Sequence, residues 1–478
     1  MNQNNISAAE LFLRVRELLI LPELEPKTRN KMMHDTLILC CHEGVKNTKQ
    51  AFGNLFAQVD YLCKVHGIKI ADKIAIQTMR RHSNKQEPLS EEDLKYDARA
   101  LAIFISAVCQ ADIPHELTVL IPHTNRPYQK GLDISNRCIR CIVKNWDSDF
   151  IHVDIDHDTD EEEHLVCLKD EANGIDHTYL CEILEEGMQL NLLDCQIRQP
   201  VITPRLIIVE PDYLIDISSI AACFTEFGHH PLLYLLNLMK PRANTQATLL
   251  GNFAGAALDD IINSHGKYQV NETIKSNFRE KALEFCTCPW FDAKKFYTDA
   301  NLQAYNLQQV VDILFPRTAS QAQMNAFRGE GIYDRKKAIL EPSFVCEALG
   351  IQGRVDLMTT DCKLLVEQKS GRNLNIESHQ ADPNYHSFQL VPHYVQLLLY
   401  YGVLQHNFKL GNNLVNIRLL YSKYQPQNGL MVVAYYQKLF REAIEYRNQL
   451  VAASFEIAKK GFEHALNEFT PDVLNVAG

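Results

Sequence analysis

The 478-residue sequence has no long apolar run and no segment built like a secretion signal. The first residues, Met1 to Asn5, contain no basic cluster followed by an apolar stretch, which a signal peptide requires. No apolar stretch reaches the roughly 20 residues needed to span a membrane. We therefore expect a cytoplasmic protein without a membrane segment.

The sequence also lacks an excess of positive charge, since it has 48 Lys and Arg against 59 Asp and Glu residues. The formal net charge of −11 argues against a protein that coats nucleic acid non-specifically, although a local basic channel is compatible with it. Much of the acidity lies in residues 154–163, DIDHDTDEEE. We expect this run to be a solvated loop; the alternative is a surface that mimics DNA or repels it.

The 14 cysteines follow no regular framework. In a chain without a signal peptide, this indicates reduced thiols. The lone pair Cys138-Ile139-Arg140-Cys141 has no clear second pair, so we expect it to belong to a strand rather than to a zinc or redox site.

A phosphate-binding loop is missing too. The pattern Gly-x-x-x-x-Gly-Lys-Ser/Thr occurs nowhere, so this polypeptide is not expected to hydrolyse ATP. What is present is ordinary globular composition, 46% hydrophobic and 22% charged residues, in a chain long enough for several domains.

The most informative segment is GIQGRVDLMTTDCKLLVEQKSG, from Gly350 to Gly371. Two apolar runs joined by a polar turn at 359–361 predict a β-hairpin. Because side chains alternate along a strand, Glu367 and Lys369 share one face, and Asp356 on the neighbouring strand can meet Glu367. Two carboxylates beside an ammonium group suit a hard divalent cation and an activated water. The alternative is an ordinary hairpin with an exposed acid and a salt-bridging lysine.

The residues around these three resemble a known family. Gly353-Arg354-Val355 precedes Asp356, and Ser370-Gly371 follows Lys369. Together they resemble the PD-(D/E)XK nuclease superfamily, and most closely its RecB-like branch, whose strands read G-x-x-G-(K/R)-(I/V)-D and E-x-K-(S/T)-G. The resemblance implies an α/β fold with a mixed central sheet flanked by helices, and a metal-dependent nuclease.

A second match lies in residues 393–400, HYVQLLLY. Gln396 and Tyr400 share one face of a predicted helix and resemble the Q-x-x-x-Y motif of the same branch. That resemblance implies that Gln396 holds the lysine or the scissile strand, and that Tyr400 contacts a phosphate or stacks on a base. A core helix with two satisfied polar residues is the alternative.

Flanking segments resemble one subgroup of this branch, which contains a flap-trimming replication helicase–nuclease and the CRISPR-associated adaptation nucleases. They are residues 207–220, a predicted late strand at 419–423, and the pair Arg447-Asn448. The resemblance covers about residues 205 to 460.

The chain departs from the family where many members bind an iron–sulfur cluster. His230 stands at the position of the first cluster cysteine, and no cysteine follows Cys362. Since cluster ligation needs thiolates from both ends of the domain, we expect no such cluster.

It also departs at the helix that normally supplies a histidine ligand in a G-x-x-x-H pattern. Counting from Gly255, the histidine position holds Asp259. A carboxylate is an acceptable Mg²⁺ ligand, so Asp259 is our candidate third ligand. In the other interpretation, Asp259 and Asp260 form the solvated side of a helix. Glu341, which precedes a proline, is a further alternative.

The motifs together imply one site that binds Mg²⁺ or Mn²⁺. Its expected metal ligands are Asp356, Glu367, the backbone carbonyl of Gln368, and Asp259. Its expected catalytic residues are Asp356, Glu367, Lys369, Gln396 and Tyr400. Lys369 would position or deprotonate the water, or stabilise the pentacovalent phosphate.

Three regions are expected along the chain. Residues 1–125 are predicted to be helical from apolar residues at three- and four-residue spacing, with a helix N-cap at Ser90. Residues 126–206 contain short β runs, which predict a small barrel, either OB-like or SH3-like. Residues 207–470 would form the nuclease domain.

The expected function is hydrolysis of phosphodiester bonds in single-stranded, flap or end DNA during replication or repair, beside a separate helicase domain or subunit. One rival is a catalytically degenerate nucleic-acid-binding subunit of a helicase–nuclease complex. The missing histidine favours this rival, and the complete set of Asp356, Glu367 and Lys369 counts against it. A second rival is a defence or CRISPR-type nuclease, against which the large N-terminal region counts.

Overall fold

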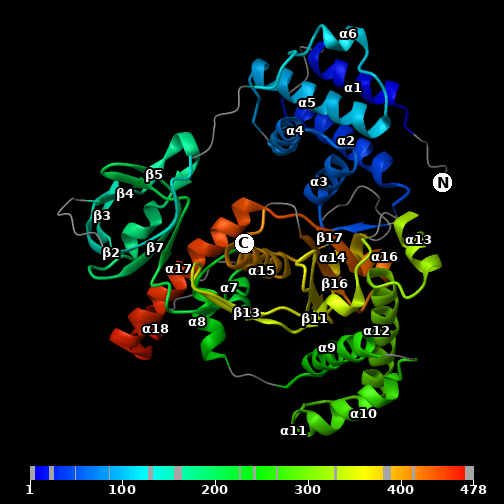
Figure 1. The fold of residues 1–478 in the computed structure, drawn as a ribbon, viewed down its shortest axis with the longest axis vertical. Coiled ribbons are helices and arrows are strands. Elements are labelled where there is room, and N and C mark those ends of the chain that lie inside the picture. The colour runs from blue at the N-terminus through cyan, green and yellow to red at the C-terminus, as the bar shows by residue number, and fades with distance from the viewer. Residues whose placement is uncertain are drawn as a thin grey trace.

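The chain arranges a helical bundle, a small barrel and a helix-covered sheet around one another (Figure 1). The structure is a computed structural model. It describes residues 6–20, 26–48, 50–85, 87–126, 133–155, 164–225, 228–240, 244–264, 267–327, 331–379, 389–411 and 415–468.

The first region is helical, as its spacing of apolar residues predicts. Its elements are α1 (Ala8–Ile20), α2 (Pro26–Val45), β1 (Ala51–Phe52), α3 (Leu55–Val65), α4 (Ile70–Ser83), α5 (Glu91–Cys109) and α6 (His115–Thr118). Ser90 caps α5, because its side chain accepts a hydrogen bond from the backbone N–H of Asp93. Leu18, Leu37 and Phe104, from three different helices, are fully buried in one core.

The second region is a small barrel of five strands. Its elements are β2 (Asn136–Trp146), β3 (Phe150–Ile155), β4 (His164–Cys167), β5 (Lys169–Asp170), η1 (Glu171–Asn173), β6 (Ile175–Asp176), η2 (Thr178–Glu182), β7 (Gln189–Arg198), β8 (Val201–Thr203) and β9 (Leu206–Val209). The barrel order is β2-β3-β4-β8-β7, and β7 pairs with β2 to close it. Only the pair β4–β8 is parallel.

Two expectations fall within this barrel. Cys138 and Cys141 both lie in β2, so the lone cysteine pair is part of a strand, as predicted. The barrel sheet extends past the boundary that we placed at residue 206, because β9 pairs with β7. Of the acidic run, Asp154 and Ile155 belong to β3, and residues 156–163 lie outside the described residues.

The third region is built on a mixed sheet with the order β1-β17-β16-β15-β14-β11, beside a small sheet with the order β10-β13-β12. The strands are β10 (Ile215–Asp216), β11 (Ala338–Leu340), β12 (Ser343–Cys346), β13 (Ile351–Arg354), β14 (Leu357–Thr359), β15 (Leu364–Lys369), β16 (Asn416–Tyr421) and β17 (Leu430–Val433). β14 and β15 form the predicted antiparallel hairpin. β16 lies parallel to β15, and β1 from the first region lies parallel to β17.

Helices cover both faces of the central sheet (Figure 1). They and the short helices around them are α7 (Ile217–Ala221), α8 (Leu232–Met239), α9 (Gln246–Asn263), α10 (Val270–Glu280), α11 (Ala282–Cys286), α12 (Ala293–Leu314), α13 (Ala319–Phe327), η3 (Arg335–Lys337), α14 (Leu374–His379), α15 (Val391–Phe408), α16 (Pro426–Gly429), α17 (Gln437–Lys460) and α18 (Phe462–Glu468). Because side chains alternate along β15, Leu364 and Val366 pack with α9 and α12. Leu365 packs on the other face, with α15 and α17.

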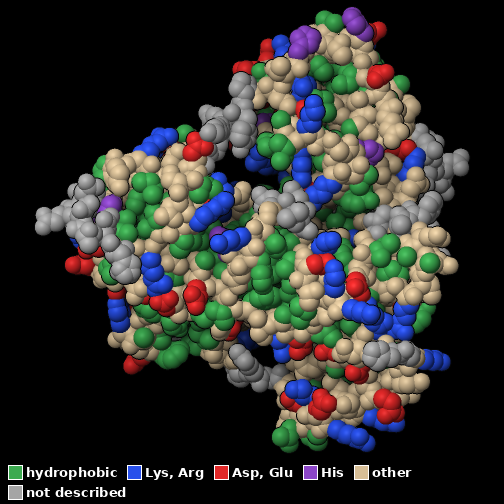
Figure 2. All heavy atoms as spheres, viewed as in Figure 1, with side chains coloured by type: hydrophobic (Ala, Val, Ile, Leu, Met, Phe, Trp, Pro, Cys, Tyr) green, Lys and Arg blue, Asp and Glu red, His purple; other side chains and the backbone are tan. Residues whose placement is uncertain are grey.

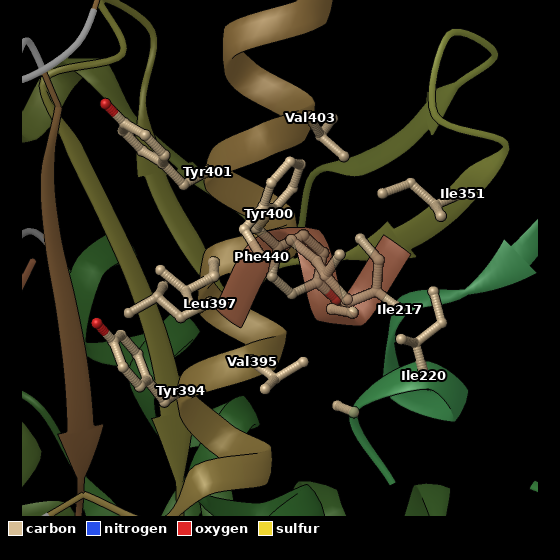
Figure 3. Packing of buried hydrophobic residues seen from close by; sticks show 14 of the residues in the cluster. Ile217, Ile220, Ile351, Tyr394, Val395, Leu397, Tyr400, Tyr401, Val403 and Phe440 are labelled. Atoms are coloured by element: carbon tan, nitrogen blue, oxygen red, sulfur yellow. The ribbon is translucent and has the colours of Figure 1, made fainter. Parts of the chain in front are cut away.

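α15 is the most deeply buried helix next to the hairpin. Val395, Tyr400 and Val403 project from it toward α7, β13 and α17, where they meet side chains such as Ile217 and Phe440 (Figure 3). The position of α15 against the sheet is therefore fixed by packing along its length. Within the described ranges, none of the helices combines the length and the apolar character needed to cross a lipid bilayer. The fold as a whole is mixed α/β.

Candidate active site

Asp356 lies where the chain leaves the small sheet and enters the central one. β13 ends at Arg354, and β14 begins at Leu357. The side-chain Oδ2 of Asp356 accepts a hydrogen bond from the backbone N–H of Gln368, at 2.6 Å. The sequence pattern placed Asp356 at the end of one hairpin strand and missed this change of sheet. The bend turns the Asp356 carboxylate onto β15.

Glu367 and Lys369 share one face of β15, as alternation predicts. The Nζ atom of Lys369 donates to Oε1 of Glu367 and to Oε1 of Gln396, both at 2.8 Å. Gln396 comes from α15, which covers this face of the sheet. One ammonium group therefore connects the strand and the helix.

The Glu367 carboxyl group is unusually isolated. Its residue is 2% exposed, and its Oε2 atom is buried without a hydrogen-bond partner. Burial, and then the negative charge of Asp356, raise the pKa of Glu367 to about 8 in spite of the nearby Lys369. Glu367 therefore holds a proton at neutral pH, and its charged form would be stabilised by a further positive charge at the unpartnered oxygen.

The backbone N–H and carbonyl of Gln368 point to the edge of β15 at which Asp356 lies. The carbonyl of Lys369 accepts from Ser422 on the β16 side. Since successive backbone groups of a strand point to opposite edges, the carbonyl of Gln368 points to the other edge, where its N–H already meets Asp356. That orientation is the one expected of a carbonyl ligand.

The side chain of Gln368 turns away from the site, into a buried chain of hydrogen bonds. Its Nε2 atom donates to Oγ of Ser422, which donates to Oε1 of Gln303 on α12, each at 2.7 Å. Gln303 also donates to the carbonyl of Ser370, at 3.1 Å. Sequence reasoning missed Gln303 and Ser422, since neither belongs to a motif. They fix the end of β15.

Asp259 and Asp260 of α9 point in different directions. Asp260 accepts a hydrogen bond from Thr273 on α10. Asp259 is half-buried, and burial followed by the charges of Glu341, Asp260 and Asp356 raises its pKa to about 7. Asp259 therefore lies within electrostatic reach of Asp356, whereas Asp260 belongs to the solvated side of the helix.

Glu341 lies close to the same group. Its backbone N–H donates to the carbonyl of Asp356, at 2.9 Å, and its carboxylate pairs with Arg354, at 3.0 Å. Its φ of 48° is in the left-handed region, which a non-glycine residue seldom adopts. Asp356 thus has acidic neighbours on two sides, Glu367 on one and Glu341 with Asp259 on the other.

Tyr400 has a different position from the one that its expected role requires. Its ring is 3% exposed, and its hydroxyl donates to the carbonyl of Arg354, at 2.6 Å. A Cβ atom at Gly353 would lie 3.0 Å from that hydroxyl, which accounts for a glycine there. A buried ring cannot stack on a base, so in this structure Tyr400 supports the bend that carries Asp356. Its expected contact with a phosphate stays a prediction.

Arg447 and Asn448 of α17 bond the backbone segments that lead into this bend. Arg447 is fully buried and donates to the carbonyls of Gly350, Val209, Glu210 and Tyr213. At Gly350, with φ +61°, a Cβ atom would lie 2.2 Å from the guanidinium. Asn448 bonds both the N–H of Val209 and the carbonyl of Ile207. The pair joins the last barrel strand to the strand that precedes Asp356.

His393 is a further neighbour that the sequence motifs did not single out. It lies one turn before Gln396 on α15, and its Nδ1 atom is 3.0 Å from the hydroxyl of Tyr421. Burial and the charge of Lys369 lower the pKa of His393 to about 3. The His393 ring is therefore neutral at pH 7 and lines the site without adding charge. The three-residue spacing to Gln396 is the signal that could have indicated it.

The sequence motifs imply a divalent metal ion, and the oxygen donors that the structure brings together can be compared with that expectation. Within the described ranges, no three His, Cys, Asp or Glu side chains already converge as a ready-made metal site. The unpartnered oxygen of Glu367, the adjacent Asp356 and the Gln368 carbonyl are nevertheless oxygen donors of the kind that Mg²⁺ and Mn²⁺ take. These three groups fit a metal, and Asp259 as a further ligand stays a prediction.

The expected absence of an iron–sulfur cluster stays a prediction. His230 lies between α7 and α8, where its backbone N–H donates to the carbonyl of Cys223, at 2.9 Å. Comparison with known proteins adds no assignment: a scan of the chain against protein-family models finds no match, and a search of curated proteins finds no similar sequence.

Proposed function

We propose that this chain is a Mg²⁺- or Mn²⁺-dependent nuclease that hydrolyses phosphodiester bonds in single-stranded, flap or end DNA. The observation that carries the proposal is the arrangement on β15. Lys369 joins Glu367 to Gln396 beside Asp356, while one oxygen of Glu367 is buried without a partner. Such a set suits a reaction in which negative charge builds up on a phosphate.

The fold supports the finer assignment to a PD-(D/E)XK core of the RecB-like kind. A mixed sheet is covered by helices on both faces, and the acids gather where β15 ends. Gly350 and Gly353 of the first motif make room for Arg447 and Tyr400. These motif glycines therefore have a physical reason in this chain.

Each residue of the site has a separate task. A divalent cation bound at Asp356, Glu367 and the Gln368 carbonyl would supply Lewis-acid chemistry and lower the pKa of water. Lys369 stabilises the developing charge or holds the attacking water, and Gln396 fixes its ammonium group. Tyr400 is a positioning residue, since it acts through the Arg354 carbonyl.

The barrel supports a single-stranded substrate. With β2, β3, β4, β7 and β8 numbered one to five, its order is 1-2-3-5-4, with a parallel pair between the third and fifth strands. OB barrels bind single strands, and we assign this barrel to that kind. We further propose that a separate helicase supplies the strand during replication or repair.

Cleavage of labelled single-stranded and flap DNA with Mn²⁺, Mg²⁺ or EDTA tests the proposal. Wild type should cut with either metal and not with EDTA. Lys369→Ala should cut about 10²–10⁴-fold more slowly, because the ammonium group is lost from the reaction centre. Lys363→Ala, an exposed change in the turn just before β15, should cut like wild type.

Equal absence of cutting in wild type and Lys369→Ala, with DNA still bound, would overturn the proposal. The chain would then be a catalytically degenerate binding subunit. Asp259 in place of a histidine, and the lack of three converging side chains among the described residues, are the features that favour that alternative.

A further inference from the structure

A polar cavity of about 840 Å³ lies where the three regions of the chain meet. Arg81 of α4 and Tyr96 of α5 line it from the helical bundle, Gly174 from the barrel, and Arg441 of α17 from the third region. Figure 2 shows Lys and Arg side chains gathered around a hollow between these parts of the molecule.

The charge of the cavity wall is unbalanced. Four arginines line it, against two aspartates. The aspartates are already engaged: Asp93 pairs with Arg126, at 2.6 Å, and Asp97 meets His82, at 2.7 Å. The two aspartates therefore balance positive charge at the wall formed by α5. Among the residues that the structure describes, they do not pair with the arginines on the other walls.

Arg205 and Arg441 are the two arginines of the opposite wall. Arg441 has its Nε atom buried without a hydrogen-bond partner and bonds only weakly to the carbonyl of Gly174, at 3.3 Å. Arg205 has Asp194 as its ion-pair partner, at 3.9 Å. Burial, and then the positive charge of Arg205, lower the pKa of Arg441. Like charges held beside a cavity are stabilised by an anion.

Arg81 completes the set from the third side. It is exposed, and its Nη2 atom donates to the neutral hydroxyl of Thr78, at 2.9 Å. Tyr96 adds an aromatic ring, over which Arg126 lies at 5.1 Å. Guanidinium groups on separate walls with an aromatic ring among them are the chemistry by which proteins hold a sugar–phosphate strand.

We propose that this cavity binds the backbone of a single-stranded nucleic acid, through Arg81, Arg205 and Arg441. A small anion would reach one or two of these side chains, because they come from different regions, whereas a polyanion reaches all three. α17 also packs against α15, the helix that carries Gln396, so the strand would pass beside the helix of the candidate active site. The proposal rests on the proposed function for the nature of the polyanion, and its test needs no cleavage.

The experiment is fluorescence anisotropy of a labelled oligo(dT) of about 12 nucleotides with the full chain in EDTA. Arg81→Glu and Arg205→Gln should each weaken binding, by about tenfold for the charge reversal, and should flatten the salt dependence by roughly 0.7 per lost phosphate contact. Arg279→Glu on α10 is the charge-matched control and should bind like wild type.

Two results would overturn the proposal. In one, Arg81→Glu and Arg205→Gln bind oligo(dT) as Arg279→Glu does. In the other, inorganic phosphate competes as well as oligo(dT) at equal phosphate, which would make the cavity a small-anion site. Circular dichroism shows whether each variant is folded, and Arg81→Glu alters only an exposed side chain. Weakened binding in these variants without any cleavage by wild type would contradict the nuclease and leave the strand site standing.

Discussion

At the scale of single residues, the defining feature of the site is the buried carboxyl group of Glu367, one oxygen of which has no hydrogen-bond partner. The placement of Glu367 and Lys369 on one face could be predicted from the sequence, because side chains alternate along a strand. The burial of Tyr400 could not be predicted, since it depends on Gly353 from a distant strand. The split between Asp259 and Asp260 likewise depends on where α9 packs.

Replacing Glu367 with glutamine separates folding from function. The amide keeps the shape of the carboxyl group, which burial keeps mostly protonated at neutral pH without metal, so the variant without metal should unfold at about the same temperature as wild type. It should lose cleavage and the rise in unfolding temperature that Mn²⁺ gives to wild type. Differential scanning fluorimetry with Mn²⁺ and with EDTA measures both.

Glu347→Gln is the matched control for this substitution, because Glu347 is an exposed acid just before Gly350. It should keep both the metal response and the cleavage. A metal-induced rise in unfolding temperature that survives in Glu367→Gln would show that the metal binds elsewhere.

At the scale of elements, local pattern predicted several of the strands and helices, and tertiary pairing decided others. Alternation predicted β3 and the β14–β15 hairpin, and helical spacing predicted α1. The extension of the barrel sheet by β9 and the addition of β1 to the central sheet join segments far apart in sequence. Periodicity within one segment carries no information about such partners.

The barrel should lose stability in mild acid through His177. This residue precedes η2 and is buried, and burial lowers its pKa to about 4. In the unfolded chain a histidine titrates near 6.5, so protons bind the unfolded state first as the pH falls. The stabilising effect of neutral His177 is thus present above pH 6.5 and is lost as the pH falls toward 4.

Urea midpoints between pH 7 and 4, followed by the fluorescence of Trp146 in β2 on a Trp290→Phe background, measure this effect. His177→Leu should flatten the fall of the midpoint with acid. His123→Leu, a change of an exposed histidine, should leave it as steep as in the parent. An unchanged slope in His177→Leu would assign the acid sensitivity to other groups.

At the scale of the whole molecule, α17 connects the barrel to the central sheet. Arg447 bonds carbonyls of Val209 and Gly350 at once, and Asn448 bonds the hydroxyl of Tyr179 as well as β9. The sequence resemblance identified this Arg-Asn pair, but its role in linking the barrel to the central sheet follows only from the burial of the guanidinium.

Arg447→Met should weaken the link between the barrel and the central sheet. It takes the Arg447 donor from the buried carbonyls of Val209 and Tyr213, whereas those of Gly350 and Glu210 keep a backbone N–H, and this loss costs about 3 kcal/mol. Unfolding of the barrel, read from Trp146, should then separate from unfolding of the whole chain, read from far-UV circular dichroism. Lys438→Met, an exposed change on the same helix, should leave the two transitions as they are in wild type. Coincident transitions in Arg447→Met would show that other contacts couple the two regions.

The two-residue strand β1 has a consequence for the order of assembly during synthesis. Ala51 pairs with Met431, and Phe52 with Val432, so this edge of the sheet cannot form until most of the chain has left the ribosome. Contacts between such distant segments form slowly, and the apolar side chains that await them are exposed meanwhile. Phe52 packs against Ala57 and Tyr61 of α3 and against Ala434, so through most of translation the side of its ring that meets Ala434 would stay open to the solvent until the last strand of the sheet emerges.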